Sequence, residues 1–146
     1  MSELLEKARS YEAKKIAATD KESKPLFHIS APAGWINDPN GFSVYNGKIH
    51  LFYQYYPYLR EWGPMHWGHS TTSDMIKWEQ LPCVLAPDEE YDKKGCFSGS
   101  AIEADGKHVL VYTGVTRIKL PDGSEQERQN QCIAFGDGLN YVKHEN

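Results

Sequence analysis

The chain has 146 residues, of which 40% are hydrophobic and 25% charged, a composition typical of one soluble globular domain. Its net charge of −4, without a basic stripe, argues against nucleic acid as a partner. No apolar run is long enough to span a membrane, and the polar start of the chain lacks a signal peptide, so a cytoplasmic protein is expected. The three cysteines, Cys83, Cys96 and Cys132, lack the paired spacing of a disulfide framework or a zinc site. We therefore expect neither a metal nor a cofactor.

Residues 2–19 are predicted to form a helix, because Ser2 can cap it and acidic residues occupy its first turn. Its apolar residues fall near one face, which indicates a packing arm; they are Leu4, Leu5, Ala8, Tyr11 and Ile16. Residues 20–26 are a polar linker. The predicted organisation is thus a helix and linker over 1–26, followed by a domain over 27–146.

From residue 27 onward the pattern changes to short strands. They are expected at 41–45, 48–55, 65–72, 77–81, 97–103, 107–114, 129–135 and 139–143, with tight turns at 46–47 and 105–106. Residues 116–128 are expected to be a polar loop, and the acidic run 88–92 a solvated loop. Trp67 and Trp78 are assigned to the core.

Two halves of this region repeat one another. Residues 46–53 match 105–112, and residues 73–78 match 136–141. Each unit is four short strands, so the predicted fold class is all-β, with two four-stranded blades of a β-propeller, an architecture that closes with about 4–8 blades. An eight-stranded β-sandwich is the main competitor, although the repeat favours blades. Two blades alone would expose flanks that normally pack on neighbours, so a homo-oligomer formed through these flanks is one alternative.

The stretch 35–41, Trp-Ile-Asn-Asp-Pro-Asn-Gly, holds the carboxylate of Asp38 between two asparagines. Pro39 has a fixed φ and biases Asp38 toward an extended backbone, and Gly41 offers a turn with positive φ. A carboxylate held at one angle suits a sugar site, with Asn37 to bind a hydroxyl and Trp35 as a flat apolar wall. The simpler interpretation is an Asx-type turn beside a buried tryptophan.

Several separated motifs then occur in a fixed order. After His28 they are 34–41, Phe-Tyr-Gln-Tyr at 52–55, Trp-Gly at 62–63, Trp-Gly-His at 67–69 and Phe-Ser-Gly-Ser at 97–100. Together they resemble glycoside hydrolase family 32, which comprises invertases, fructanases and sucrose-6-phosphate hydrolases. The segments 24–28 and 81–88 are most similar to the bacterial intracellular sucrose-6-phosphate hydrolases. The resemblance implies a retaining β-fructofuranosidase on a five-bladed propeller that acts on a small fructoside.

The resemblance also implies residue roles. Asp38 would be the nucleophile that attacks the anomeric carbon of the fructosyl unit, giving a covalent intermediate that water hydrolyses. Asn37 and Gln54 would hold sugar hydroxyls, and Trp62, Phe97 and Ser98 would line the pocket. Each also has a structural interpretation: Gln54 could satisfy buried backbone, and the other three could pack as ordinary residues. The histidines His50, His66 and His69 are taken as structural, since their spacing fits no helical ligand pair.

Two family motifs do not occur in this chain. No Glu is followed by Cys, the motif of the family's acid/base, and the only Asp-Pro is 38–39, so the Arg-Asp-Pro motif is missing. Because removing a catalytic acid loses about 10²–10⁴ in rate, the chain alone is expected to be inactive or very weak. The alternatives are a non-catalytic sugar-binding or self-associating module, and a fructan-forming transferase. Sucrose and sucrose 6-phosphate both remain open, and a phosphate would need a cation such as Arg60 or Lys93.

Overall fold

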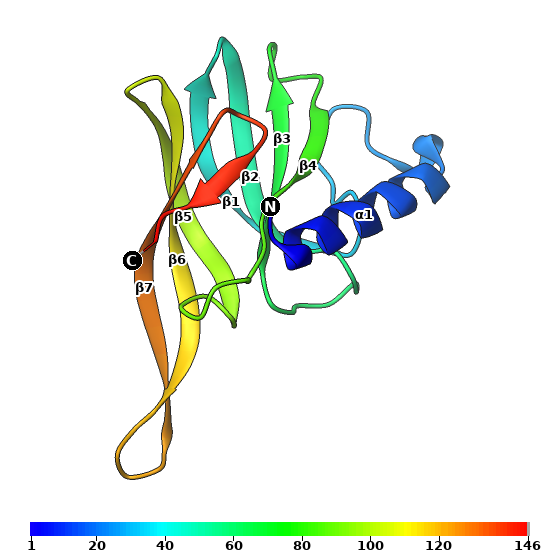
Figure 1. Cartoon of the computed structure of the whole chain (residues 1–146). Helices are drawn as coiled ribbons and strands as arrows, with labels where there is room; N and C mark the ends of the chain where they lie inside the picture. Colours follow the sequence, from blue (N-terminus) through cyan, green and yellow to red (C-terminus); the bar gives the residue numbers. More distant parts are fainter. Residues whose placement is uncertain (146) are drawn as a thin grey trace.

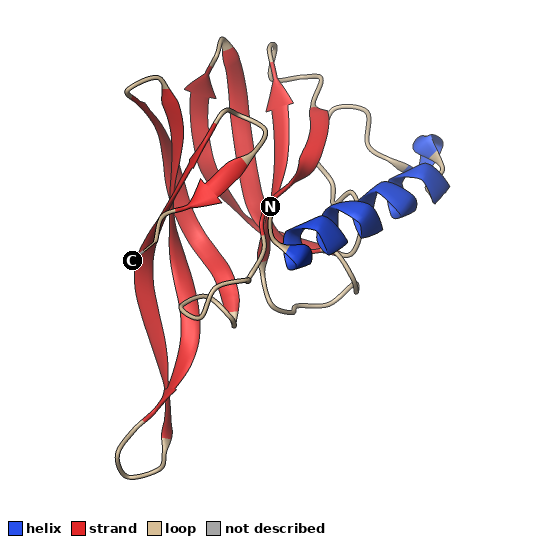
Figure 2. Cartoon of the chain, in the orientation of Figure 1, coloured by secondary structure: helices blue, strands red, loops and turns tan. Residues whose placement is uncertain are grey.

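The computed structural model describes residues 1–145 and shows one helix followed by eight strands (Figure 1 and Figure 2). The elements are α1 (Glu3–Ala18), a short 3₁₀ turn η1 (Lys21–Ser23), β1 (Trp35–Tyr45), β2 (Lys48–Tyr56), β3 (His66–Thr72), β4 (Glu79–Leu85), β5 (Gly95–Ala104), β6 (Lys107–Lys119), β7 (Glu125–Gly136) and β8 (Tyr141–Lys143). The strands form two antiparallel sheets with the simple orders β1-β2-β3-β4 and β5-β6-β7-β8. Meandering four-stranded sheets of this kind are propeller blades, so the predicted fold class is confirmed.

The repeated turns adopt the same backbone in both blades. Asn46 and Gly47 have φ values of 49° and 73°, and Asp105 and Gly106 have 51° and 73°. Two successive residues with positive φ fit the tight type I′ hairpin turn, which explains the Asn-Gly and Asp-Gly pairs. The two turns lie near each other, because the Tyr45 hydroxyl donates a hydrogen bond to the Gly106 carbonyl at 3.0 Å.

The two blades pack face to face around one apolar core. Blade 1 supplies Phe52, Trp67, Val84 and Leu85, and blade 2 supplies Cys96, Leu110, Tyr112, Cys132, Ala134 and Tyr141. Trp67 therefore lies in the core as predicted. Trp78 is only half-buried and lies outside this cluster, so its assignment to the core is wrong.

The helix covers the other face of blade 1. Leu5 and Ala8 pack against a second cluster formed by Tyr53, Tyr55, Cys83 and Ala86. Ser2 caps the helix by accepting a hydrogen bond from the Leu5 N–H at 3.2 Å. The packing arm is thus confirmed, but its buried face is narrower than predicted, because Leu4 and Ile16 are exposed. The third buried residue of the helix is Glu12, whose carboxylate accepts the Cys83 N–H at 2.7 Å.

The expected polar loop at 116–128 is instead a hairpin. Strand β6 continues to Lys119, and β7 begins at Glu125, with Arg117 opposite Glu127 and Lys119 opposite Glu125. This ribbon projects beyond the rest of the second sheet (Figure 2). The prediction failed because both faces of the ribbon are polar, so its strands carry no apolar alternation; opposite charges across the strands support the pairing instead.

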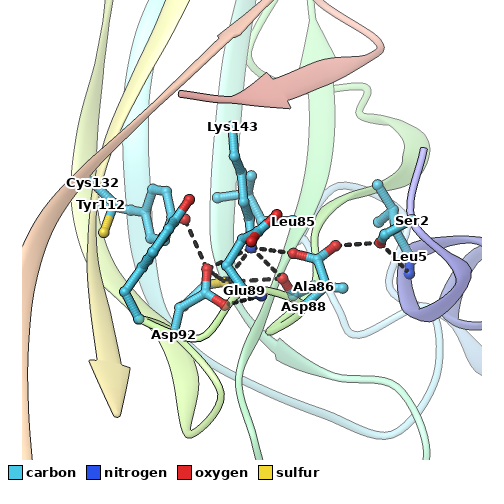
Figure 3. Close-up of polar contacts among 12 residues, drawn as sticks. Ser2, Leu5, Leu85, Ala86, Asp88, Glu89, Asp92, Tyr112, Cys132 and Lys143 are labelled. Carbon is cyan, nitrogen blue, oxygen red and sulfur yellow. Dashed lines mark hydrogen bonds and ion pairs between the residues drawn. The ribbon is translucent and has the colours of Figure 1, made fainter. Parts of the chain in front are cut away.

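The prediction that residues 88–92 form a solvated loop is also wrong for the two aspartates of this segment. Asp88 and Asp92 converge with Lys143 of β8, whose ammonium donates hydrogen bonds to both carboxylates and to the Ala86 carbonyl (Figure 3). The Asp92 carboxylate also accepts the Tyr112 hydroxyl at 2.8 Å and has no exposed side-chain surface. This network ties the segment between the blades to both of them.

Two outer strands also begin or end away from their predicted positions. Strand β4 covers 79–85 instead of 77–81 and includes Pro82, which β4 tolerates because it is an edge strand without a ladder partner on its outer side. The last strand begins at Tyr141 rather than residue 139, because residues 137–140 form a turn in which Asp137 accepts the backbone N–H groups of Leu139 and Asn140.

Candidate active site

The first strand of each blade carries a β-bulge near its start. In β1, Ile36 pairs with Tyr55 and Pro39 pairs with Tyr53, so that two residues, 37 and 38, oppose the single residue 54 of β2. Such an extra residue bends the strand and re-aims side chains, and bulges are common beside active sites. The bulge therefore turns the Asn37–Asp38 pair out of the regular ladder.

Strand β5 has its own bulge at the corresponding place. Phe97 pairs with Thr113 and Gly99 with Tyr112, so Ser98 is the inserted residue. At Gly99 a Cβ atom would lie 2.0 Å from the Val111 carbonyl oxygen, so only glycine allows this approach. The two bulges bring Asp38 and Ser98 together from neighbouring blades.

The Asp38 carboxylate accepts neutral hydrogen bonds at both oxygens. Ser98 Oγ donates to Oδ2 at 2.8 Å, and Asn37 Nδ2 lies 3.3 Å from Oδ1. The Trp35 indole N–H donates to Asn37 Oδ1 at 2.9 Å, which orients the amide so that its NH₂ faces Asp38. These contacts, with Ser98 first and Asn37 second, lower the pKa of Asp38 below its usual value. The carboxylate is exposed and ionised at neutral pH, as a nucleophile must be.

Two residues predicted to line the pocket, Trp62 and Phe97, contact each other and form an aromatic wall next to Ser98 in β5. The Trp62 ring packs edge-on against Phe97, with ring centroids 6.1 Å apart and planes at 87°. Trp62 is 57% exposed and Phe97 is half-buried, so both present ring surface to a ligand. The backbone of Phe97 is fixed because its carbonyl accepts the Trp67 indole N–H at 3.1 Å.

Gln54 lies inside the structure, away from this exposed group. It is 3% exposed, and its Nε2 donates to the Cys96 carbonyl of the neighbouring blade at 2.8 Å. This contact matches the structural interpretation, since the amide satisfies a buried backbone acceptor. Binding of a sugar hydroxyl by Gln54 stays a prediction.

Asn40 is a site residue that the sequence interpretation placed in a turn. Its backbone is part of β1, it is 3% exposed, and its Oδ1 accepts the Gly99 N–H at 3.4 Å. Gly41 has the expected positive φ of 51°, but it forms a second bulge rather than a turn, in close contact with Phe52. Asn40 thus joins the two bulged strands, and the only sequence signal for this was its place in the 35–41 stretch.

The hydrogen bonds made to Asp38 within residues 1–145 come from neutral groups. None of the hydrogen bonds of Asp38, Asn37 or Ser98 within residues 1–145 involves a second carboxylate. The loop residue Asp92 is fully buried and bonded to Lys143 and Tyr112, so it is not free to serve as an acid.

Within residues 1–145, no group of three or more His, Cys, Asp or Glu side chains is arranged to hold a metal ion. His50, His66 and His69 are buried, and His50 Nδ1 lies 2.9 Å from His69 Nε2 in the contact between the rings. In the same described part of the chain, no helix has the length and apolar character needed to cross a membrane.

The structure combines two packed propeller blades, an ionised aspartate on a β-bulge and an aromatic wall. These are features of a propeller-type glycoside hydrolase domain. The sequence profile of the glycosyl hydrolases family 32 N-terminal domain matches residues 28–146. The chain therefore belongs to glycosyl hydrolase family 32, as the motifs indicated.

Similar proteins support this assignment. The chain is 48% identical over 120 residues to the sucrose-6-phosphate hydrolase of Escherichia coli, covering 82% of this chain and 25% of that protein. It is 48% identical over 145 residues to the levanase of Bacillus subtilis, covering 97% of this chain and 21% of that protein. The structure of the GH32 β-fructofuranosidase of Bombyx mori superposes with a TM-score of 0.83 at 45% identity, covering 97% of this chain and 29% of that chain. The chain thus spans about a quarter of the length of these relatives.

Proposed function

We propose that the protein hydrolyses the β-fructofuranosidic bond of a sucrose-type substrate with retention, and that Asp38 is its nucleophile. The observation that carries this proposal is the Asp38 carboxylate itself. It is exposed and held ionised by two neutral donors, Ser98 and Asn37, at the point where the blades meet. Neutral donors orient the carboxylate without neutralising its charge, whereas a Lys or Arg partner would compete with the substrate for it.

The chemistry has two steps. Asp38 attacks the anomeric carbon, the bond to the leaving oxygen breaks, and a fructosyl ester forms on the carboxylate; water then hydrolyses the ester. The leaving oxygen needs a proton from a second carboxyl group, which in retaining enzymes lies about 5–5.5 Å from the nucleophile. We propose that this acid lies outside the two blades described here. On this proposal the 146-residue chain alone acts on sucrose very weakly or not at all.

The aromatic wall is proposed to contact the fructosyl ring. Phe97 directly precedes Ser98, and Trp62 packs against Phe97, so both present apolar ring surface on which a sugar ring can stack. The relatives are named for sucrose 6-phosphate, raffinose and levan, all compounds to which a fructofuranosidase is suited. A mutant of the Bombyx mori relative has been solved in complex with sucrose. These names support a fructoside as the substrate class of this chain.

The experiment is fructose release from sucrose and from sucrose 6-phosphate, measured with the purified chain and with Asp38→Asn. Both proteins are expected to stay at the no-enzyme blank. Turnover by the chain that disappears in Asp38→Asn would support the nucleophile and overturn the proposal that the acid lies elsewhere. Turnover that persists in Asp38→Asn would overturn the role of Asp38.

A second candidate, self-association, is favoured by an apolar row on blade 2, in which three of the four residues are exposed and Val109 is buried. Ile102, Val109, Phe135 and Val142 are cross-strand partners on the face that points away from blade 1. Val142 is 74% exposed and Ile102 60%. Sedimentation equilibrium would show a dimer that Val142→Lys dissociates, whereas the control Leu26→Lys in the linker leaves it intact. A monomer at all concentrations would reject this candidate.

A further inference from the structure

A polar hollow of about 370 Å³ lies between the helix and the loop that follows β2. Three cationic residues line it from three different segments: Lys15 from α1, Lys24 from the linker and Arg60 from the loop. The rest of its lining consists of two tyrosines, Leu59, prolines and small or hydroxyl-bearing residues. No Asp or Glu among the described residues belongs to the lining.

The ion pairs of the described residues lie outside the hollow. Lys48, Lys93, Arg117 and Lys143 each pair with a carboxylate. Within residues 1–145, no such ion pair includes a cation of the hollow. Cations that line one hollow with no carboxylate in its lining repel one another, and this occurs in a chain whose net charge is −4. A bound anion would remove that repulsion.

The lining residues are held in place by contacts that leave N–H donors of the cations free to bind a ligand. The Lys24 ammonium donates one hydrogen bond to the Ala31 carbonyl, which leaves two of its three N–H groups unused. The Lys15 ammonium lies 5.5 Å from the centre of the Tyr11 ring. The Tyr11 hydroxyl in turn donates to the Tyr58 carbonyl at 3.1 Å, which fixes the helix to the loop that carries Arg60.

We propose that this hollow binds a phosphate group, either as the free ion or on a small sugar. A phosphate offers several strong acceptor oxygens and up to two negative charges, which match two ammonium groups and a guanidinium. The volume is within the range of small-ligand pockets, about 300–1,000 Å³. Of the two cations considered from the sequence, Arg60 lines the hollow, whereas Lys93 pairs with Glu90.

The hollow and the Asp38 site are connected by neighbouring residues of the chain. Gly34 lines the hollow and directly precedes Trp35, whose indole orients Asn37 beside Asp38. The proposal goes beyond the proposed function and does not depend on it. It assigns an anion site to the surface between the helix and the first blade.

The test is a titration of the chain with inorganic phosphate, followed by amide chemical shifts. Saturable shifts are expected in residues 15, 24 and 60 and their neighbours. Lys24→Gln and Arg60→Gln should each weaken binding about tenfold, the loss expected for one charge-assisted hydrogen bond. The matched control Lys48→Gln removes an equal charge from an exposed pair with Glu79 and should leave the affinity unchanged.

A second titration distinguishes the source of the phosphate. Glucose 6-phosphate binding more tightly than phosphate, with glucose alone not binding, would support the site with a sugar phosphate as its ligand; equal affinities would support it with the phosphate group alone. Absence of saturable shifts, or equal weakening by Lys48→Gln, would overturn the proposal. Because the readout is phosphate binding, such a failure leaves the assignment of Asp38 untouched.

Discussion

Ser98 and Asp38 are 60 residues apart in the chain, and the Ser98 hydroxyl donates a 2.8 Å hydrogen bond to the Asp38 carboxylate. This contact joins the first strands of the two blades at the candidate active site. It is also the largest cause of the lowered pKa of Asp38. The ionisation of Asp38, the proposed nucleophile, therefore depends on the packing of one blade against the other.

Ser98→Ala should raise the pKa of Asp38 toward its ordinary value, because the ionised form loses its main donor. The measurement is the carboxyl carbon shift of Asp38 by NMR between pH 2 and pH 7. Ser100→Ala, an exposed serine on the same strand, serves as the control and should leave the titration unchanged. An unchanged Asp38 titration in Ser98→Ala would show that the hydrogen bond does not form in solution.

Glu12 should make the docking of the helix sensitive to pH. Burial beneath β4 raises the pKa of Glu12 to about 7, although the Cys83 N–H opposes this shift. The folded state therefore binds the proton more tightly than the unfolded state. The contribution of Glu12 to stability is complete below about pH 4.5 and falls by up to about 3 kcal/mol as the pH rises to 7.

Urea unfolding of the chain and of Glu12→Gln at several pH values tests this. Glutamine mimics the protonated acid and can still accept the Cys83 N–H, so the variant should lose this pH dependence and be the more stable protein at pH 8. Glu6→Gln on the exposed face of the helix should behave like the parent chain. A difference in stability between Glu12→Gln and the parent chain that stays constant over this range would exclude a buried acid at position 12.

His108 should give the contact between the blades the opposite pH dependence. Its ring stacks on Tyr45 with centroids 4.7 Å apart, and its two nitrogens contact Ser43 Oγ at 2.9 Å and the Tyr141 hydroxyl at 2.7 Å. Burial, and to a lesser extent His50, lowers the pKa of His108 to about 4. The unfolded state thus binds the proton more tightly, so stability present above about pH 6.5 is lost as the pH falls toward 4.

The expected loss through His108 is up to about 3 kcal/mol, measured as the melting temperature between pH 7 and pH 4. His108→Gln retains polar contacts but cannot titrate, so its melting temperature should rise relative to that of the parent chain as the pH falls from 7 to 4. The exposed His28 provides a control, since His28→Gln should preserve the parent dependence. Equal pH dependence in His108→Gln and the parent would assign the acid sensitivity to other groups.

Lys143→Met should be strongly destabilising, because it leaves the carboxylates of Asp88 and Asp92 buried without their cation. The expected loss in the free energy of unfolding is about 3–5 kcal/mol. Lys93→Met, which breaks only a surface pair with Glu90, should cost less than about 1 kcal/mol. Adding Asp88→Asn and Asp92→Asn to Lys143→Met should recover part of the stability; no recovery would mean that the lysine acts through packing.

The hairpin turns, the repeat and the motif order could all be predicted from local sequence. Asn46-Gly47 and Asp105-Gly106 favour the tight turns that they form. Asp38 could be identified as a candidate from the residues next to it in the sequence. The bulges could not be predicted, because a bulge is defined by the register with the next strand. The burial of Asp92 depends on Lys143, and that of Glu12 on Cys83, both distant in sequence.

The most direct test of the central claim uses a fructoside with a leaving group that needs no acid, such as p-nitrophenyl β-fructofuranoside. If Asp38 is the nucleophile, it can displace p-nitrophenolate without the second carboxyl group, and the fructosyl ester should accumulate on the chain. Intact-mass analysis and peptide mapping should then find one fructosyl unit on Asp38, and none on Asp38→Asn. No adduct on the chain, or an adduct that persists in Asp38→Asn, would contradict the account.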